Sequence, residues 1–139
     1  MQRVERWSET PVAQRDAWRQ SFIASAAALR GDRAAAQAPS AKYTELILRL
    51  ASARPHELLM ARDGDVTGRA LVSAATGRAA AAVGLVELAV GEAGANAARA
   101  LVDAATEWAE QTGLDELIAP VDVNTWFSYR FLLPPAPGP

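Results

Sequence analysis

Residues 80–90 form a nearly continuous apolar run, and the pattern that follows it leaves few folds open. The run reads Ala-Ala-Ala-Val-Gly-Leu-Val-Glu-Leu-Ala-Val and contains β-branched residues, which is typical of a strand covered on both faces. Residues 95–112 then carry apolar side chains at helical spacing, and Gly113 is placed to end that helix. Residues 114–121 predict a second, short strand. A strand, a helix and a strand in this order form a crossover unit, so the two strands should lie parallel in one sheet.

Two further strands are predicted directly upstream. Residues 56–62 and 66–74 are rich in apolar residues and flank Asp63-Gly64-Asp65. Because Asp-Gly readily supplies the positive φ angles of a short hairpin loop, this segment predicts a β-hairpin. Together with the crossover, it predicts the α/β (α+β) class: a mixed sheet in which the strand at 80–90 is central.

The N-terminal part of the chain predicts helices. Thr10 followed by Pro11 is typical of an N-cap and a first helical residue, which predicts a helix over 11–30 that ends at Gly31. Trp18, Phe22, Ala26 and Leu29 fall on one stripe of this helix, as expected of a face that packs on something else. Residues 42–52 predict a second helix, after a linker at 32–41.

The organisation predicted for the whole chain is one domain of 139 residues with a short tail. Residues 1–131 form the domain, made of a helical part at 11–53 and a sheet-containing part at 56–131. Asn124 to Phe131 predicts a brief helix. Residues 132–139 are rich in proline, which favours an extended, unpaired tail.

Composition excludes several classes of function. A net charge of −2 and a pI near 5.4 argue against nucleic acid as a partner, since phosphate binding needs a surplus of Lys and Arg. The sequence has no cysteine and a single histidine, His56, which leaves neither a disulfide framework nor a structural zinc site, and no metal is expected. The N-terminus opens with polar residues and no run is long enough to span a membrane, so we expect a cytoplasmic protein without membrane contact.

The order of these elements resembles the GNAT superfamily of acyl-CoA-dependent N-acyltransferases. The resemblance covers residues 56–131 and, loosely, the N-terminal helices. Four short sequence segments support the resemblance: Ala61-Arg62-Asp63-Gly64 on the hairpin, Gly84-Leu85-Val86-Glu87 on the apolar strand, Ala98 to Ala105 on the long helix, and Ala119 to Trp126 after it. Family members continue with further strands that close the acceptor side, whereas this sequence passes into proline. The resemblance therefore implies a divergent, C-terminally truncated member whose last strands are missing.

The resemblance also implies a cofactor site where the long helix begins. In the family, a loop of pattern Gln/Arg-x-x-Gly-x-Gly/Ala feeds this helix, and its amides hold the pyrophosphate of acetyl-CoA. Here Gly91, Gly94 and Asn96 occupy the three defined positions. Unpaired amides and partial positive charge at a helix start favour an anion on physical grounds as well. The residues expected to bind acetyl-CoA or another acyl-CoA are Val90, Gly91, Gly94, Ala95, Asn96, Ala97 and Asn124.

Chemistry in this family is the attack of an amine on the thioester, with one group taking the ammonium proton and another protonating the leaving sulfur. The resemblance assigns these roles to Glu87 as base and Tyr129 as acid. A strand-edge carboxylate and a packed aromatic residue are the alternative interpretations. Trp108 and Trp126 are expected to pack against the sheet.

Three functions are consistent with these patterns. The first is an acyl-CoA-dependent N-acyltransferase, or its degenerate relative, that acetylates an unknown small-molecule or peptide amine. The second is a non-catalytic acyl-CoA-binding or protein-interaction module with the same fold. The third is a structural partner subunit without a ligand. An uncovered last strand also predicts a homodimer through that exposed sheet edge.

Overall fold

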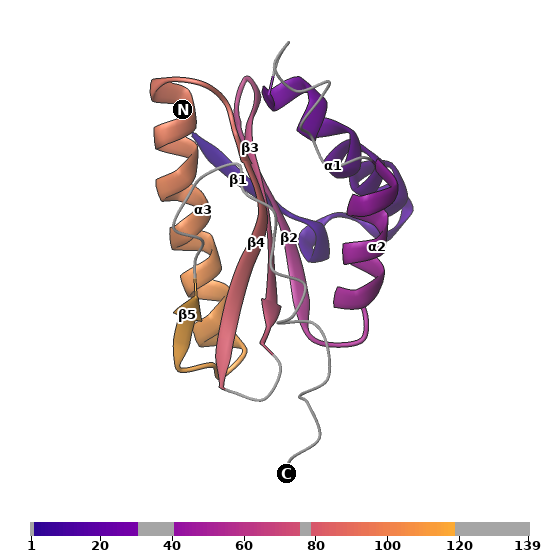
Figure 1. Cartoon of the computed structure of the whole chain (residues 1–139), viewed down its shortest axis with the longest axis vertical. Coiled ribbons are helices and arrows are strands. Elements are labelled where there is room, and N and C mark those ends of the chain that lie inside the picture. The colour runs from indigo at the N-terminus through magenta and orange to yellow at the C-terminus, as the bar shows by residue number, and fades with distance from the viewer. Residues whose placement is uncertain (1, 31–40, 76–78, 119–139) are drawn as a thin grey trace.

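A sheet lies between two layers of helices in the computed structural model, which describes residues 2–30, 41–75 and 79–118 (Figure 1). Over these residues the sheet has five strands in the order β1-β2-β3-β4-β5. The elements are β1 (Arg3–Arg6), the 3-10 helices η1 (Trp7–Glu9) and η2 (Val12–Gln14), α1 (Arg15–Arg30), α2 (Ala41–Ala51), β2 (His56–Asp63), β3 (Asp65–Ala74), β4 (Ala80–Leu88), α3 (Glu92–Gln111) and β5 (Glu116–Ile118). Helices α1 and α2 cover one face of the sheet, and α3 covers the other (Figure 1).

The crossover at the end of the described chain is confirmed. Strands β4 and β5 pair in parallel, with Ala80 opposite Glu116 and Ala82 opposite Ile118. Helix α3 connects them, and every residue of β4 is buried, as predicted for a strand covered on both faces. The mixed α/β class is therefore confirmed, with β4 inside the sheet between β3 and β5, and β3 as the middle strand of those described.

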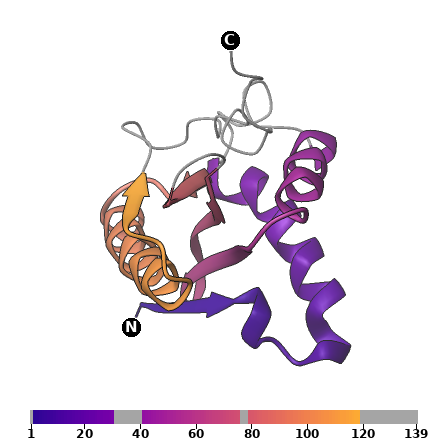
Figure 2. The ribbon, with the colours of Figure 1, turned by 90° about the horizontal axis from the view of Figure 1, so that it is seen from below.

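The hairpin is confirmed as β2 and β3, which pair antiparallel up to Asp63 opposite Asp65. Gly64 between them has φ +78°, the left-handed conformation that the Asp-Gly pattern predicts. Strand β1 was not predicted. It is four residues long and pairs antiparallel with β2, and so short a segment shows no readable alternation. Figure 2 shows β1 at the outer edge of the sheet, between α3 and the start of α1.

The start of the first helix differs from the prediction. The sequence predicts Thr10 as an N-cap and Pro11 as the first helical residue, but α1 begins at Arg15, after η2. The Thr10 hydroxyl donates backward to the Arg6 carbonyl at 3.1 Å and so closes η1, which makes the N-cap prediction wrong. The second helix is confirmed as α2, within one residue of its predicted bounds.

Two apolar cores result, one on each face of the sheet. The α1/α2 core contains Phe22, Ile47, Leu48, Leu58, Met60, Leu71 and Leu85. The α3 core contains Leu59, Val72, Val83, Val86, Leu101 and Trp108. Trp108 is 8% exposed within the α3 core, so its predicted packing role is confirmed.

Several predictions lie outside the described residues: the end of the strand at 119–121, Trp126, the brief helix at 124–131 and the tail at 132–139. Among the residues that are described, no helix is long and apolar enough to cross a membrane. The same residues contain no group of three or more His, Cys, Asp or Glu side chains that could hold a metal ion.

Candidate functional site

The first turn of α3 presents backbone amides that the helix itself cannot use. Gly91 is the N-cap, with φ +85° and ψ −155°, and its carbonyl accepts from the Ala95 amide at 3.2 Å. An α-helix that starts in this way provides no acceptor for the amides of residues 91–94. Gly91, Glu92 and Ala93 are exposed. Because the helix dipole adds partial positive charge here, this turn is suited to bind an anion.

Gly94 lets this turn sit directly on the end of β4. A Cβ atom at Gly94 would lie 1.8 Å from the Ala89 carbonyl oxygen, so only glycine fits without a shift of the main chain. A second close approach lies on β3, where a Cβ atom at Gly68 would be 3.0 Å from the Ala97 Cβ. Two glycines thus fix how closely the start of α3 approaches the sheet.

The N-terminal residue Gln2 also holds this end of α3. In the orientation that satisfies both atoms of its amide, Gln2 donates to the Thr67 hydroxyl and the Arg62 carbonyl, each at 3.0 Å. Its oxygen then accepts from the Ala97 amide at 3.2 Å. Gln2 therefore bridges β2, β3 and α3 just behind the exposed turn.

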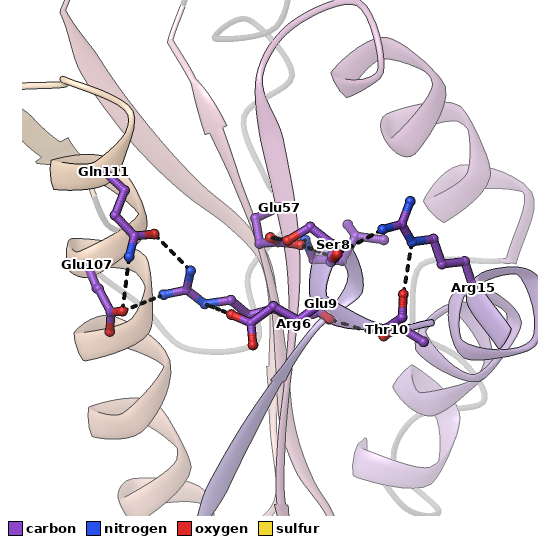
Figure 3. A network of polar contacts seen from close by, with 9 residues as sticks. Arg6, Ser8, Glu9, Thr10, Arg15, Glu57, Glu107 and Gln111 are labelled. Atoms are coloured by element: carbon purple, nitrogen blue, oxygen red, sulfur yellow. Dashed lines mark hydrogen bonds and ion pairs between the residues drawn. The ribbon is translucent and has the colours of Figure 1, made fainter. Parts of the chain in front are cut away.

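Arg6 holds the other end of α3, as Figure 3 shows. Its Nη1 donates to Gln111 Oε1 at 3.0 Å, and its Nη2 lies 3.3 Å from Glu107 Oε1. Contacts at both ends of a 20-residue helix fix its direction, and with it the direction of the first-turn amides.

Further contacts in Figure 3 fix the chain that carries Arg6. Ser8 donates both its amide, at 3.1 Å, and its hydroxyl to the buried Glu57 carboxylate on β2. Arg15 donates to the Ser8 carbonyl at 2.9 Å and to the Thr10 carbonyl at 3.0 Å. These contacts attach η1 to the sheet on one side and to α1 on the other.

A β-bulge in β4 decides where Glu87 points. On β3, Ala70 alone separates Arg69 from Leu71, whereas their partners on β4, Glu87 and Gly84, are separated by two residues. One of these two, Leu85, has φ +48°. The extra residue reverses the alternation of faces along the strand.

The β4 side chains that belong to each of the two cores show this reversal. On β4, the side chains that join the α1/α2 core are Ala80, Ala82 and, past the bulge, Leu85. Those that join the α3 core are Ala81, Val83, Val86 and Leu88. Glu87 therefore faces the α1/α2 layer, whereas an unbroken alternation from Ala80 would direct it toward α3.

Glu87 lies opposite a buried arginine. Arg69 is its cross-strand partner, and both residues are 0% exposed. Arg69 Nη1 donates to the Phe22 carbonyl of α1 at 2.7 Å, and its guanidinium carbon lies 4.9 Å from the centre of the Phe22 ring. Glu87 is thus an interior carboxylate opposite a cation, on a strand that lies between β3 and β5 and is not at an edge of the described sheet.

The remaining residues expected at the site lie as follows. Val90 is 81% exposed, directly before Gly91, and Ala95 and Asn96 are exposed on the first turns of α3. Ala97 is 0% exposed and packs in the α3 core. Tyr129 and Asn124 lie outside the described residues.

Glu92 and Ala93 lie inside the predicted cofactor-binding turn but were not named individually. The reason is that the helix was predicted to begin at residue 95 but begins at Glu92. The signal that could have located them is the position of Gly91 as an N-cap. The exposed Glu92 side chain also places a carboxylate in this first turn.

No family model matches the sequence, and no curated protein matches it either. Solved structures do match the fold. Glucosamine-6-phosphate N-acetyltransferase from Arabidopsis thaliana superposes with a TM-score of 0.56 at 11% identity, over 88% of this chain and 84% of that one. Ribosomal-protein-alanine N-acetyltransferase from Brucella melitensis gives 0.55 at 21% identity, over 88% and 81% of the two chains.

A third match is AAC(6')-Iy in complex with the bisubstrate analogue CoA-S-monomethyl-acetylneamine, with a TM-score of 0.58 at 14% identity, over 88% of this chain and 80% of that one. At these identities the likeness establishes the fold. The chain has the fold of the GNAT N-acetyltransferases, in a form whose sequence has diverged far from them.

Proposed function

We propose that this protein is an acyl-CoA-dependent N-acyltransferase that moves an acetyl group from acetyl-CoA to an amine. The observation that carries the proposal is the start of α3, where unused amides are exposed on a turn packed against the end of β4. Two of the similar folds belong to proteins named N-acetyltransferases, and a third, AAC(6')-Iy, is bound to a bisubstrate CoA analogue.

The donor groups of the turn fit a diphosphate. The amides of residues 91–94 can donate to phosphate oxygens without any side chain, and charge-assisted bonds of this kind each contribute about 1.5–3 kcal/mol. Val90, Ala95 and Asn96 flank them on the surface. The Glu92 carboxylate opposes an anion, but its side chain is exposed and can turn into solvent, where the repulsion is weak.

Acetyl-CoA, when bound, supplies a thioester whose carbonyl carbon an amine can attack. Glu87 is the proposed base: its carboxylate takes the proton of the acceptor ammonium, directly or through one water molecule. Because the bulge turns Glu87 toward the α1/α2 layer, the proposed acceptor approaches from that side of the sheet. Tyr129 is the proposed acid, which protonates the departing sulfur. The acceptor is a small-molecule or peptide amine.

A thermal shift with acetyl-CoA tests cofactor binding first. A ligand at one hundred times its dissociation constant stabilises the folded state by about 2.7 kcal/mol, a shift of several degrees for a domain of this size. Release of free thiol from acetyl-CoA in the presence of a panel of amines then tests turnover. Binding without thiol release identifies the non-catalytic acyl-CoA-binding module. The absence of any shift at millimolar acetyl-CoA refutes both.

A further inference from the structure

We propose that Arg69 is a positioning residue, which serves as the counter-ion of Glu87 and links its carboxylate to helix α1. The inference rests on the proposed function, because it assigns a role to a residue that supports the proposed base. It starts from three observations: the bulge in β4, the complete burial of both residues, and the contact of Arg69 with Phe22.

The register places the two side chains opposite each other on one face of the sheet. Cross-strand partners on one face of an antiparallel pair have Cβ atoms about 4.5–5.5 Å apart, well within the reach of an arginine and a glutamate. Arg69 and Glu87 are such partners only because the bulge turns Glu87 toward the α1/α2 layer. Without the extra residue at Leu85, Glu87 would face α3, and an apolar residue would lie opposite Arg69 instead of Glu87.

Within the part of the chain that the structure describes, no other buried charged side chain lies on this face. Among the described residues, the buried charged side chains are Glu57, Arg69 and Glu87. Glu57 is bound to Ser8 and lies opposite Val72, which belongs to the α3 core. The described charged side chains of α1 and α2 are half-buried or exposed: Arg15, Asp16, Arg19, Glu45 and Arg49. Arg69 is therefore the one buried cation among the described residues that lies opposite Glu87, and a counter-charge of this kind stabilises a buried carboxylate.

The orientation of Arg69 is fixed from α1. Its hydrogen bond to the Phe22 carbonyl and its position over the Phe22 ring hold the guanidinium at two points. Phe22 is itself 0% exposed and stacks on Trp18, with ring centres 6.0 Å apart. Because α1 covers the face on which the acceptor is expected, a displacement of α1 would move Arg69 and with it the charge beside Glu87.

The consequence for catalysis is a division of roles. Glu87 exchanges the proton, and Arg69 holds the carboxylate in position without contact with the substrate. Removal of Arg69 takes away the counter-charge opposite Glu87, so the position of the carboxylate is no longer fixed from α1.

The test compares Arg69→Met, Glu87→Gln and the double variant with the unaltered chain. Unfolding by urea should show that Arg69→Met alone lowers the folding equilibrium constant about 100-fold, whereas in the Glu87→Gln background the loss is at most about 10-fold. The double variant removes both charges of the pair, so it keeps the comparison meaningful if Arg69→Met folds poorly. Equal losses in both backgrounds would overturn the inference.

A comparison of kcat with KM separates positioning from a purely structural role. In Arg69→Met, kcat for acetyl transfer should fall at least about tenfold while KM for acetyl-CoA stays unchanged. Arg62→Met is the matched control: it removes another arginine that donates to a carboxylate, Glu5, and should leave kcat unchanged. An unchanged kcat in Arg69→Met would show a structural role only and overturn the inference.

The two proposals fail in different ways. If the chain turns over acetyl-CoA but Arg69 and Glu87 show no coupling, the positioning role is refuted and the proposed function stands. If the two residues are coupled in urea but no amine releases thiol, the proposed function is refuted, and the catalytic role of Arg69 falls with it.

Discussion

Substitution of Gly94 by alanine should separate cofactor binding from stability. The added methyl would lie 1.8 Å from the Ala89 oxygen, against a closest real contact of about 3.0 Å, so the start of α3 must move by about 1.2 Å, the difference of these distances. Overpacking of this kind costs about 1–3 kcal/mol. Alanine recovers about 1 kcal/mol of that through its higher helix propensity. The net loss in the free energy of unfolding should therefore be only about 0–2 kcal/mol.

Gly94→Ala should weaken the binding of acetyl-CoA more than it lowers the free energy of unfolding. A shift of about 1.2 Å moves the amides of residues 91–94 away from their ligand, and a hydrogen bond longer than 3.5 Å no longer counts as one. The loss of one or two charge-assisted bonds, at about 1.5–3 kcal/mol each, raises the dissociation constant at least about tenfold. Isothermal titration calorimetry with acetyl-CoA measures this change directly.

Gly64→Ala is the matched control. Gly64 has φ +78° and no atom near its Cβ position, so alanine there costs about 1–2 kcal/mol of backbone strain in a hairpin turn that is not part of α3. This variant should lose stability without a change in the dissociation constant of acetyl-CoA. The reasoning fails if Gly94→Ala binds acetyl-CoA as tightly as the unaltered chain, or if Gly64→Ala weakens binding equally.

Three further predictions concern folding and assembly. Ser8→Ala should lower the free energy of unfolding by about 1–3 kcal/mol, because the buried Glu57 loses its hydroxyl donor. In urea unfolding, Ser52→Ala at an exposed site serves as the control and should change the free energy of unfolding by less than about 0.5 kcal/mol. Equal losses in Ser8→Ala and Ser52→Ala would contradict the role of Ser8 as a donor to Glu57. Partial burial raises the pKa of Glu5, but hydrogen bonds from Arg62 and Trp18 and the charges of Arg62 and Arg3 outweigh it, so the pKa lies below its usual 4.5. A carboxyl group with a lowered pKa stabilises the folded state at pH values above its pKa in the unfolded chain. This stabilisation is lost as the pH falls through its pKa in the folded state. The difference in stability between the unaltered chain and Glu5→Gln should therefore shrink below about pH 4. A difference as large at pH 3 as at pH 7, measured by thermal unfolding, would refute this. Finally, β5 is the outer strand of the sheet over the described residues, and the expected homodimer through this edge should appear in sedimentation at high micromolar concentration; a monomer there would exclude it.

The periodicity of the sequence was sufficient to predict the sheet and its crossover. A buried strand, a helix and a parallel strand each leave a pattern of apolar residues over many positions, and β4, α3 and β5 were found in this way. Asp63-Gly64 located the hairpin because its turn requires a positive φ. Strand β1 is only four residues long and has no such pattern.

The site was less predictable because its decisive features depend on register. Gly94 could be singled out as a glycine before a helix, but the clash that explains it involves the Ala89 carbonyl and exists only once β4 and α3 are packed. The bulge at Leu85 depends on how β4 pairs with β3, and nothing in β4 alone determines that pairing. Arg69 was therefore read only as part of a hairpin, although it lies opposite Glu87 in the fold.

Backbone amides pose a different difficulty. Glu92 and Ala93 are proposed to act through N–H groups that every residue other than proline has, so the residue type carries no signal. Only the position of the helix start identifies them, and helix starts are predicted from sequence to within a few residues at best.

The amide resonances of the first turn of α3 offer the most direct measurement. In two-dimensional ¹H–¹⁵N spectra, addition of acetyl-CoA should shift the amide signals of Gly91, Glu92 and Ala93 in a saturable manner, and excess inorganic pyrophosphate should compete for the same signals. Amides of the hairpin turn at Gly64 should not move. If millimolar acetyl-CoA leaves the first-turn signals in place, or shifts them no more than the hairpin, this turn does not hold the diphosphate.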